Sequence, residues 1–287
     1  MSALDGQVAV ITGGNSGIGK ETAAELAGMG AHVIIAARNP TKAAAAVAEI
    51  QQRSPGATVE HLPLDLASFA SVHAFADAFT ARFDRLDVLV NNAGASLAKR
   101  TETVDGHETQ FQVNHLGHFL LTNLLFGPMA RSAPARVINV SSTGHTFARA
   151  GLDFDDLDWE RRKYRGFLVY CATKLANVLF TRELARRYED TKLTANAVHP
   201  GWVASNFGRE GDMGVFIGLA MVASRPLMIS SAKGAHTSVY LASSPDVSGI
   251  TGQYFYQCKV AKPSNAALDE AAAARLWDVS AEMTGLS

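Results

Sequence analysis

Cysteine is scarce in this chain of 287 residues, which contains only Cys171 and Cys258. Two cysteines cannot make a disulfide framework, so we expect a reducing, cytoplasmic compartment. The N-terminal residues lack a basic segment followed by an apolar run, and we expect no signal peptide. The longest apolar stretch, residues 213–223, is too short to span a bilayer, so no transmembrane segment is predicted.

A strong charge of either sign is also missing, because 26 basic residues are nearly balanced by 27 acidic ones. Such a balance gives no electrostatic reason to expect nucleic acid or an anionic membrane as a partner. Cysteine and histidine show no paired metal-ligand spacing, so we predict no metal. A composition of 47% hydrophobic and 18% charged residues suits a globular protein with a sizeable core.

Apolar runs typical of buried strands alternate along the chain with segments of helical periodicity. The expected strands are residues 8–11, 32–37, 58–62, 86–90, 136–140, 193–198 and 253–256. The expected helices are residues 21–29, 41–52 (after Asn39–Pro40), the segment capped by Ser68, 108–129, 170–188 and 231–242. This alternation predicts a single α/β domain over residues 1–287, a Rossmann-type doubly wound parallel sheet of about seven strands with helices on both faces.

A glycine-rich turn joins the first expected strand to the first helix. Glycines permit a tight turn and a close backbone approach, and the N-terminus of the following helix attracts a pyrophosphate. The spacing differs from the G-x-G-x-x-G fingerprint, and the alternative is an ordinary glycine turn; in this position we favour a dinucleotide site. The residues expected at the cofactor are Gly13, Asn15, Ser16, Gly17, Ile18 and Gly19.

The end of the second expected strand bears on which dinucleotide fits. An acidic residue there would bond the ribose 2′-hydroxyl of NAD, whereas this chain has Arg38. A guanidinium group can pair bidentately with a phosphate, so we predict a preference for NADP(H). The alternative is a surface arginine at a strand end.

Tyr170 and Lys174 lie four residues apart in an expected helix. Positions i and i+4 share one helix face, so the two side chains lie alongside each other. A nearby cation stabilises a phenolate, and we expect Lys174 to lower the pKa of Tyr170 from its ordinary value of about 10. The pair can therefore move a proton, although an unrelated pair on a helix is the alternative.

In this context, further motifs resemble the short-chain dehydrogenase/reductase family over nearly the whole chain. The family's serine, which hydrogen-bonds the substrate oxygen, matches Ser142. Its helix asparagine, thought to hold a water that links the lysine to solvent, matches Asn114. The resemblance thus implies Asn114, Ser142, Tyr170 and Lys174 as the catalytic residues.

The same resemblance implies further cofactor contacts. The family's NNAG motif, which stabilises the sheet and lines the adenosine side, matches residues 91–94, and its adenine-edge aspartate matches Asp65. Val203 is expected to meet the carboxamide through its backbone, and Ser205 stands where the family usually has threonine. The cofactor residues added in this way are Asp65, Leu66, Asn92, Ala93, Gly94, Tyr170, Lys174, Pro200, Gly201, Val203 and Ser205.

Residues 113–122, 170–177 and 252–259 look like the retinol dehydrogenases and their relatives, which include WW-domain oxidoreductase. Residues 144–167 indicate the inserted surface element of that branch. The resemblance implies an NADP(H)-dependent oxidoreductase of a lipophilic aldehyde, ketone or alcohol, with Tyr170 as general acid and base. Two alternatives stay open: reduction of an activated C=C bond, and a non-catalytic NADP(H)-binding sensor or scaffold.

Several segments admit two interpretations. Residues 206–230 form a lid over an apolar pocket, which we favour, or a patch in peripheral contact with a lipid surface. A homodimer or homotetramer is expected through helices 108–129 and 170–188, whose apolar residues serve either that interface or the core. Those residues are Phe119, Leu120, Leu124, Val178 and Leu179.

Three further features have a structural interpretation and a functional one. We favour packing over metal binding for His115 and His118, and a buried thiol for Cys171. The acidic run after residue 152 is most simply a solvated loop, with a divalent cation as the alternative. Its members are Asp153, Asp155, Asp156 and Asp158.

Overall fold

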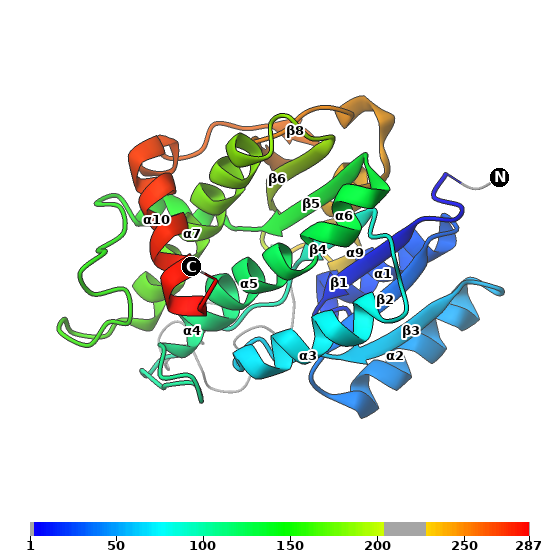
Figure 1. Cartoon of the computed structure of the whole chain (residues 1–287), viewed down its shortest axis with the longest axis horizontal. Coiled ribbons are helices and arrows are strands. Elements are labelled where there is room, and N and C mark those ends of the chain that lie inside the picture. The colour runs from blue at the N-terminus through cyan, green and yellow to red at the C-terminus, as the bar shows by residue number, and fades with distance from the viewer. Residues whose placement is uncertain (1–2, 204–227, 287) are drawn as a thin grey trace.

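The computed structural model describes residues 3–203 and 228–286. Its centre is one sheet with the strand order β3-β2-β1-β4-β5-β6-β7-β8, parallel except for β8, which runs antiparallel to β7 (Figure 1). The strands are β1 Val8–Thr12, β2 His32–Ala37, β3 Val59–Pro63, β4 Val88–Asn91, β5 Ala135–Val140, β6 Leu193–His199, β7 Tyr254–Tyr256 and β8 Lys259–Val260.

Helices cover both faces of this sheet, with α1, α2 and α9 on one face and α3, α5, α7 and α10 on the other (Figure 1). The helices are α1 Gly17–Gly28, α2 Pro40–Arg53, α3 Phe69–Thr80, α4 Thr109–Phe111, α5 Gly117–Leu124, α6 Phe126–Ser132, α7 Gly166–Arg187, α9 Ser231–Ser243 and α10 Glu270–Thr284. The prediction of a doubly wound α/β sheet is confirmed.

Alternate side chains of the central strand β1 pack into two cores on opposite faces of the sheet. Ala9 and Ile11 of β1 pack into the core beneath α1 and α9, whereas Val8 and Val10 pack into the core beneath α3 and α5. All five residues of β1 are buried. A strand covered on both faces has no polar side, which explains its continuous apolar run.

Two predicted helix starts are confirmed by their caps. The Asn39 side chain accepts a hydrogen bond from the Lys42 amide at 2.9 Å, and Ser68 accepts one from the Ser71 amide at 3.3 Å. Each cap satisfies an amide that has no partner within its own helix.

The single helix predicted over residues 108–129 is wrong in detail. The segment forms α4, a π-helical turn at Gln112–Leu116, α5 and α6. Pro128 has no amide hydrogen to donate to the carbonyl four residues earlier, which accounts for the break at Leu125. The continuity of the apolar pattern concealed these interruptions.

The C-terminal helix α10 and the short strand β8 were not predicted. Asp269 caps α10 by accepting from the Ala272 amide at 2.9 Å, and Gly285 ends it in the left-handed region at φ 69°. Trp277 of α10 is buried against the rings of Phe119, Phe180 and Tyr188. This contact holds α10 against α5 and α7.

We predict that Trp277→Ala lowers the free energy of unfolding by about 3–5 kcal/mol, because the substitution opens a cavity where α10 meets α5 and α7. Urea unfolding monitored by circular dichroism measures the change. Val104→Ala, at a side chain that is 84% exposed, is the matched control and should stay within about 0.5 kcal/mol of the unaltered protein. Equal stability of the two variants would contradict the packing role of Trp277.

Candidate active site

The predicted site residues converge where the parallel strands end. In open α/β sheets, ligands bind outside the carboxyl ends of the strands. The turn after β1, Arg38 after β2, Asp65 after β3 and the residues 92–94 after β4 all lie at this edge. Ser142 follows β5 and Pro200 follows β6 at the same edge.

The turn after β1 is shaped for a backbone that must come close to its neighbours. Gly13 and Gly17 adopt φ values of 66° and 54°, which favour glycine. A Cβ atom on Gly19 would lie 2.5 Å from both the side-chain nitrogen Nδ2 of Asn92 and the carbonyl oxygen of Gly13. The turn thus leaves no room for a side chain at Gly19, in the first turn of α1, which fits the close approach of a pyrophosphate.

Thr12, the residue that precedes this turn, joins three segments. Its hydroxyl oxygen accepts the amides of Asn92 at 2.8 Å and Ala93 at 2.9 Å, and lies 2.9 Å from Nε2 of His118. The Asn92 side chain donates back to the Thr12 carbonyl at 2.8 Å. The turn after β1 and the turn after β4 are therefore held together as one unit.

His118 has a defined tautomer in this arrangement. Burial lowers its pKa to about 4, so the ring is neutral at physiological pH. Nδ1 lies 3.2 Å from the carbonyl oxygen of Asn114 and must carry the proton, which leaves Nε2 to accept the Thr12 hydroxyl. The Val90 carbonyl lies farther from that hydroxyl, at 3.4 Å. Packing of both histidines is confirmed, since His115 is also buried and pairs with Ser280 at 2.8 Å.

The adenosine end of the predicted site is formed after β2 and β3. Arg38 is exposed and, within the described residues, forms no hydrogen bond or ion pair. Asp65 is half-buried and accepts the Ala67 amide at 3.0 Å, while Leu66 is buried. A Cβ atom on Gly117 would lie 2.8 Å from the Leu66 carbonyl oxygen, so α5 packs directly against this turn. Arg38 therefore has a free guanidinium group beside an ordered turn.

Ser142 and Tyr170 come together although 27 residues separate them in the sequence. A hydrogen bond joins their side chains, and Ser142 also accepts the Gly144 amide at 3.0 Å. Lys174, one turn after Tyr170 in α7, has its Nζ 5.6 Å from the centre of the Tyr170 ring and donates to the Val140 carbonyl at 3.0 Å. The predicted serine, tyrosine and lysine thus form one cluster beside the end of β5.

Burial shifts the pKa values of this cluster. Desolvation raises the pKa of Tyr170 to about 12, and the hydrogen bond with Ser142 acts in the opposite direction without cancelling it. Burial lowers the pKa of Lys174 to about 8. The prediction that Lys174 lowers the pKa of Tyr170 is therefore not met in this structure, because desolvation by burial is the largest cause of the shift.

Asn114 lies within the π-helical turn and its side chain is fully engaged. Oδ1 accepts the Ala95 amide at 2.6 Å, while Nδ2 donates to the Ala95 carbonyl at 2.9 Å and to Thr173 at 3.0 Å. Asn114 thus ties the loop after β4 to α7. Its main-chain carbonyl accepts from His118 Nδ1 at 3.2 Å.

Two histidines that were not predicted as site residues hold the main chain at Ser142 and Thr143. His145 Nδ1 donates to the Ser142 carbonyl at 2.6 Å, since its Nε2 accepts the Ser264 amide at 3.1 Å. His199 Nδ1 accepts the Thr143 amide at 3.3 Å, and burial lowers the pKa of His199 to about 4. In the sequence, this role is indicated only by their positions, because His145 follows β5 and His199 ends β6.

The loop after β6 brings distant residues together. Gly201 has φ 91°, and a Cβ atom there would lie 2.7 Å from Ile229 Cδ1. The Ile229 amide donates to the Trp202 carbonyl at 2.8 Å, and Val203 bridges to Ile229. Ser205 and residues 206–227 of the predicted lid lie outside the described residues.

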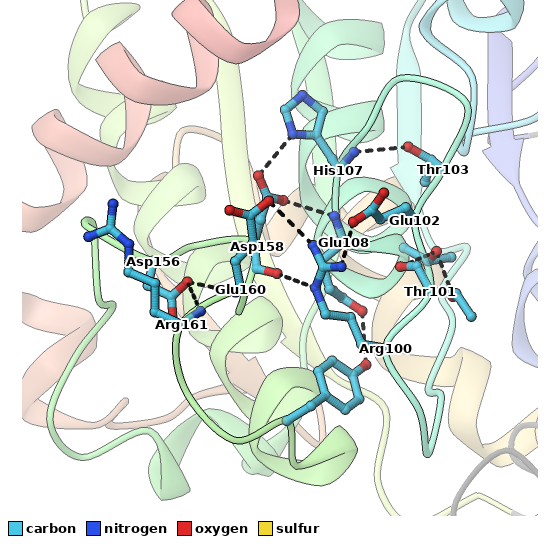
Figure 2. Close-up of polar contacts among 12 residues, drawn as sticks. Arg100, Thr101, Glu102, Thr103, His107, Glu108, Asp156, Asp158, Glu160 and Arg161 are labelled. Atoms are coloured by element: carbon cyan, nitrogen blue, oxygen red, sulfur yellow. Dashed lines mark hydrogen bonds and ion pairs between the residues drawn. The ribbon is translucent and has the colours of Figure 1, made fainter.

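The inserted element 144–167 is tied to the start of α4 by polar contacts (Figure 2). Asp158 accepts the Glu108 amide at 2.8 Å and lies 3.1 Å from His107 Nδ1. Asp156 accepts three amides, from Glu160, Arg161 and Arg162. The prediction of a solvated acidic loop is wrong for Asp156 and Asp158, because these carboxylates organise the main chain of the insert.

Other predictions about the wider molecule have mixed outcomes. Cys171 is buried, as predicted. Four of the five proposed interface residues belong to the core: Phe119, Leu120, Val178 and Leu179. Their side chains therefore give no support to the predicted oligomer. Within residues 3–203 and 228–286, no cluster of acidic, cysteine or histidine side chains has the makeup of a metal site. In the same residues, no helix is long and apolar enough to cross a bilayer.

A cavity of about 170 Å³ lies between the insert and α7, and Phe147, Val169 and Thr173 are among the residues that line it. Its walls include Leu168 and Ala172, each two residues from Tyr170. Two residues correspond to about 200° around a helix, so these side chains point away from the Tyr170 face. The cavity therefore borders α7 and the insert, and none of its walls is formed by Ser142, Tyr170 or Lys174.

Comparison with known proteins agrees with this geometry. Residues 7–152 match the family model described as short chain dehydrogenase, and retinol dehydrogenase 14 of Mus musculus is 44% identical over 301 residues. This chain belongs to the short-chain dehydrogenase/reductase family. The alignment with that relative covers 99% of this chain and 87% of the relative. Residues 157–258 match a model described as Enoyl-(Acyl carrier protein) reductase.

Solved structures of this short-chain dehydrogenase/reductase family share the fold. An uncharacterised protein from Mycobacterium paratuberculosis has a TM-score of 0.78 at 35% identity, over 99% of this chain and 97% of that one. The Pseudomonas aeruginosa RhlG/NADP active-site complex has a TM-score of 0.70 at 28% identity, over 88% of this chain and 94% of that one. The chain is thus a retinol dehydrogenase-like oxidoreductase, and this structural neighbour is a complex with NADP.

Proposed function

We propose that this chain transfers hydride between NADP(H) and a lipophilic aldehyde, ketone or alcohol. The observation that carries the proposal is the hydrogen-bonded pair of Ser142 and Tyr170, with Lys174 one helical turn away. These groups lie at the sheet edge where the glycine turn also ends. A hydroxyl pair of this kind can hold and protonate one carbonyl oxygen.

Preference for NADP(H) is proposed from Arg38, whose exposed guanidinium group has no competing partner in the described residues. The glycine turn would hold the pyrophosphate through main-chain amides, and Arg38 would pair with the 2′-phosphate. Asp65 and Leu66 would border the adenine, and residues 92–94 the adenosine ribose. Main-chain atoms of Gly201 and Val203 would lie beside the nicotinamide, and Ser205 is proposed there as well.

Reduced nicotinamide, when bound, supplies the hydride. Ser142 and Tyr170 donate hydrogen bonds to the carbonyl oxygen, and Tyr170 then gives it a proton. Burial raises the pKa of Tyr170 to about 12, so the hydroxyl is protonated at neutral pH and can act as the proton donor. Lys174 stabilises the resulting phenolate, and the replacement proton enters through water held at the main-chain carbonyl of Asn114.

A second candidate reaction is the reduction of an activated C=C bond. The match of residues 157–258 to the enoyl reductase model favours keeping it. Product analysis by mass spectrometry and NMR distinguishes a saturated carbonyl from an allylic alcohol. A non-catalytic NADP(H) sensor would need none of the acid–base groups described above, and a chain that binds NADPH but reduces nothing would support it.

We predict that Tyr170→Phe lowers kcat for carbonyl reduction by about 10²–10⁴-fold, because the proton donor is removed. The dissociation constant for NADPH should stay within about threefold, since the ring remains. Stopped-flow turnover and fluorescence titration of NADPH measure the two effects. Near-normal turnover by this variant would rule out Tyr170 as the acid.

Arg38→Ala is expected to weaken NADPH binding by about 10–100-fold, the range for losing a hydrogen bond to a charged group. NADH lacks the 2′-phosphate, so its dissociation constant should barely change. Titration of both dinucleotides tests this. The matched control is Arg275→Ala, at an exposed arginine side chain of α10. If NADPH affinity survives in Arg38→Ala, the proposed specificity is incorrect.

The pKa of Lys174 predicts how reduction depends on pH. Its side chain is charged below about pH 8 and neutral above, whereas His118 is neutral and Tyr170 protonated across this range. Reduction should therefore fall above about pH 8 as the phenolate loses its cation. Steady-state rates from pH 6 to 10 measure the decline, and Lys174→Arg, which stays charged, should move it upward. A rate that is flat to pH 10 would contradict this role.

A further inference from the structure

Two phenylalanine side chains are exposed beside the catalytic pair. Phe147 is 58% exposed and Phe167 is 40% exposed. Their rings contact each other at a centroid distance of 5.7 Å and an interplanar angle of 63°. Single exposed apolar residues are ordinary, but two aromatic rings in contact form an apolar surface that a ligand can cover.

Both residues lie on the elements that carry the catalytic hydroxyls. Phe147 ends the 3₁₀ helix Thr143–Phe147, which Ser142 caps. Phe167 stands three residues before Tyr170 in α7, so the two share one helix face. The same face continues to Lys174. The aromatic pair therefore extends the catalytic cluster toward solvent.

The 3₁₀ helix is packed against Tyr170. A Cβ atom on Gly144 would lie 3.4 Å from both the Tyr170 Cε1 and the Ser142 hydroxyl. His145, in the same short helix, is buried and hydrogen-bonded at both ring nitrogens. Phe147 thus projects from a segment whose position relative to Tyr170 is tightly determined.

The start of α7 is equally well held. A Cβ atom on Gly166 would lie 1.9 Å from the Leu97 carbonyl oxygen, so the two main chains touch. Gln110 Nε2 donates to the carbonyls of Leu97 and Gly166, both at 3.3 Å, and to the Tyr164 hydroxyl at 2.6 Å. Tyr164 in turn donates to buried Glu108 at 2.9 Å. Phe167 is therefore presented by a rigid frame.

We propose that Phe147 and Phe167 together bind the apolar chain of the carbonyl substrate and select long chains over short ones. This assignment rests on the proposed function. A substituent on a carbonyl carbon held at Ser142 and Tyr170 that extends along the helix face of Phe167 would bury successive methylene groups against the two rings, which is favourable. A short aldehyde does not reach the rings.

The test compares NADPH-dependent reduction of decanal and butanal by the unaltered protein, Phe147→Ala, Phe167→Ala and the double variant. Each single substitution should lower the ratio of kcat/KM for decanal to that for butanal by about tenfold, through KM for decanal. Butanal turnover and the NADPH dissociation constant should change by less than about twofold. Phe147→Leu and Phe167→Leu should restore part of the ratio, and Val260→Ala, 55% exposed on β8, is the control.

The outcomes separate this assignment from the proposed function. Absence of turnover with either aldehyde in the unaltered protein overturns both. Turnover with a ratio that the substitutions leave unchanged overturns only the role of the two phenylalanines. Co-sedimentation with phosphatidylcholine vesicles adds a further comparison: loss of vesicle binding in the variants, with an unchanged ratio, would assign the rings to a lipid surface and overturn the substrate assignment.

Discussion

The hydroxyl of Thr12 is the point on which the geometry of the site depends. It accepts two successive amides from the turn after β4 and donates to neutral His118, which donates in turn to the Asn114 carbonyl. Thr12, Asn114 and His118 are buried, and an unpaired polar atom in such a place costs about 1–3 kcal/mol. The glycine turn, the Asn92 turn and the π-helical turn consequently have one compatible arrangement.

A second line of buried polar groups connects the sheet to the catalytic helix. Asn91 donates to Asn139 on the neighbouring strand at 2.8 Å, and Asn139 donates to Thr181 of α7 at 2.9 Å. The Val140 carbonyl accepts both Asn177 and Lys174. A buried network of this kind favours one register of strands and helix, because a slipped register would leave its side-chain amides without these partners. The position of Lys174 is therefore set by the sheet as much as by its own helix.

The insert contributes order rather than a second reactive centre. The carboxylates of Asp156 and Asp158 accept hydrogen bonds from main-chain amides. The hydrogen bond from Tyr164 to Glu108 links the insert to the helix that precedes Asn114. Burial raises the pKa of Glu108, and hydrogen bonds from the Phe111 amide and Tyr164 act against that rise. The frame that these contacts form holds Phe147 and Phe167 on the elements that carry Ser142 and Tyr170.

Local patterns in the sequence were sufficient for the order of strands and helices, the caps at Asn39 and Ser68, and the four-residue spacing of Tyr170 and Lys174. Each of these depends on residues close together in the chain. The π-helical turn, α10, the tautomer of His118 and the burial of Asp156 could not be predicted, because they depend on contacts between distant segments. The pKa of Tyr170 shows the difference most clearly: spacing indicated a neighbouring cation and a lowered value, whereas folding removed water from the hydroxyl and raised it.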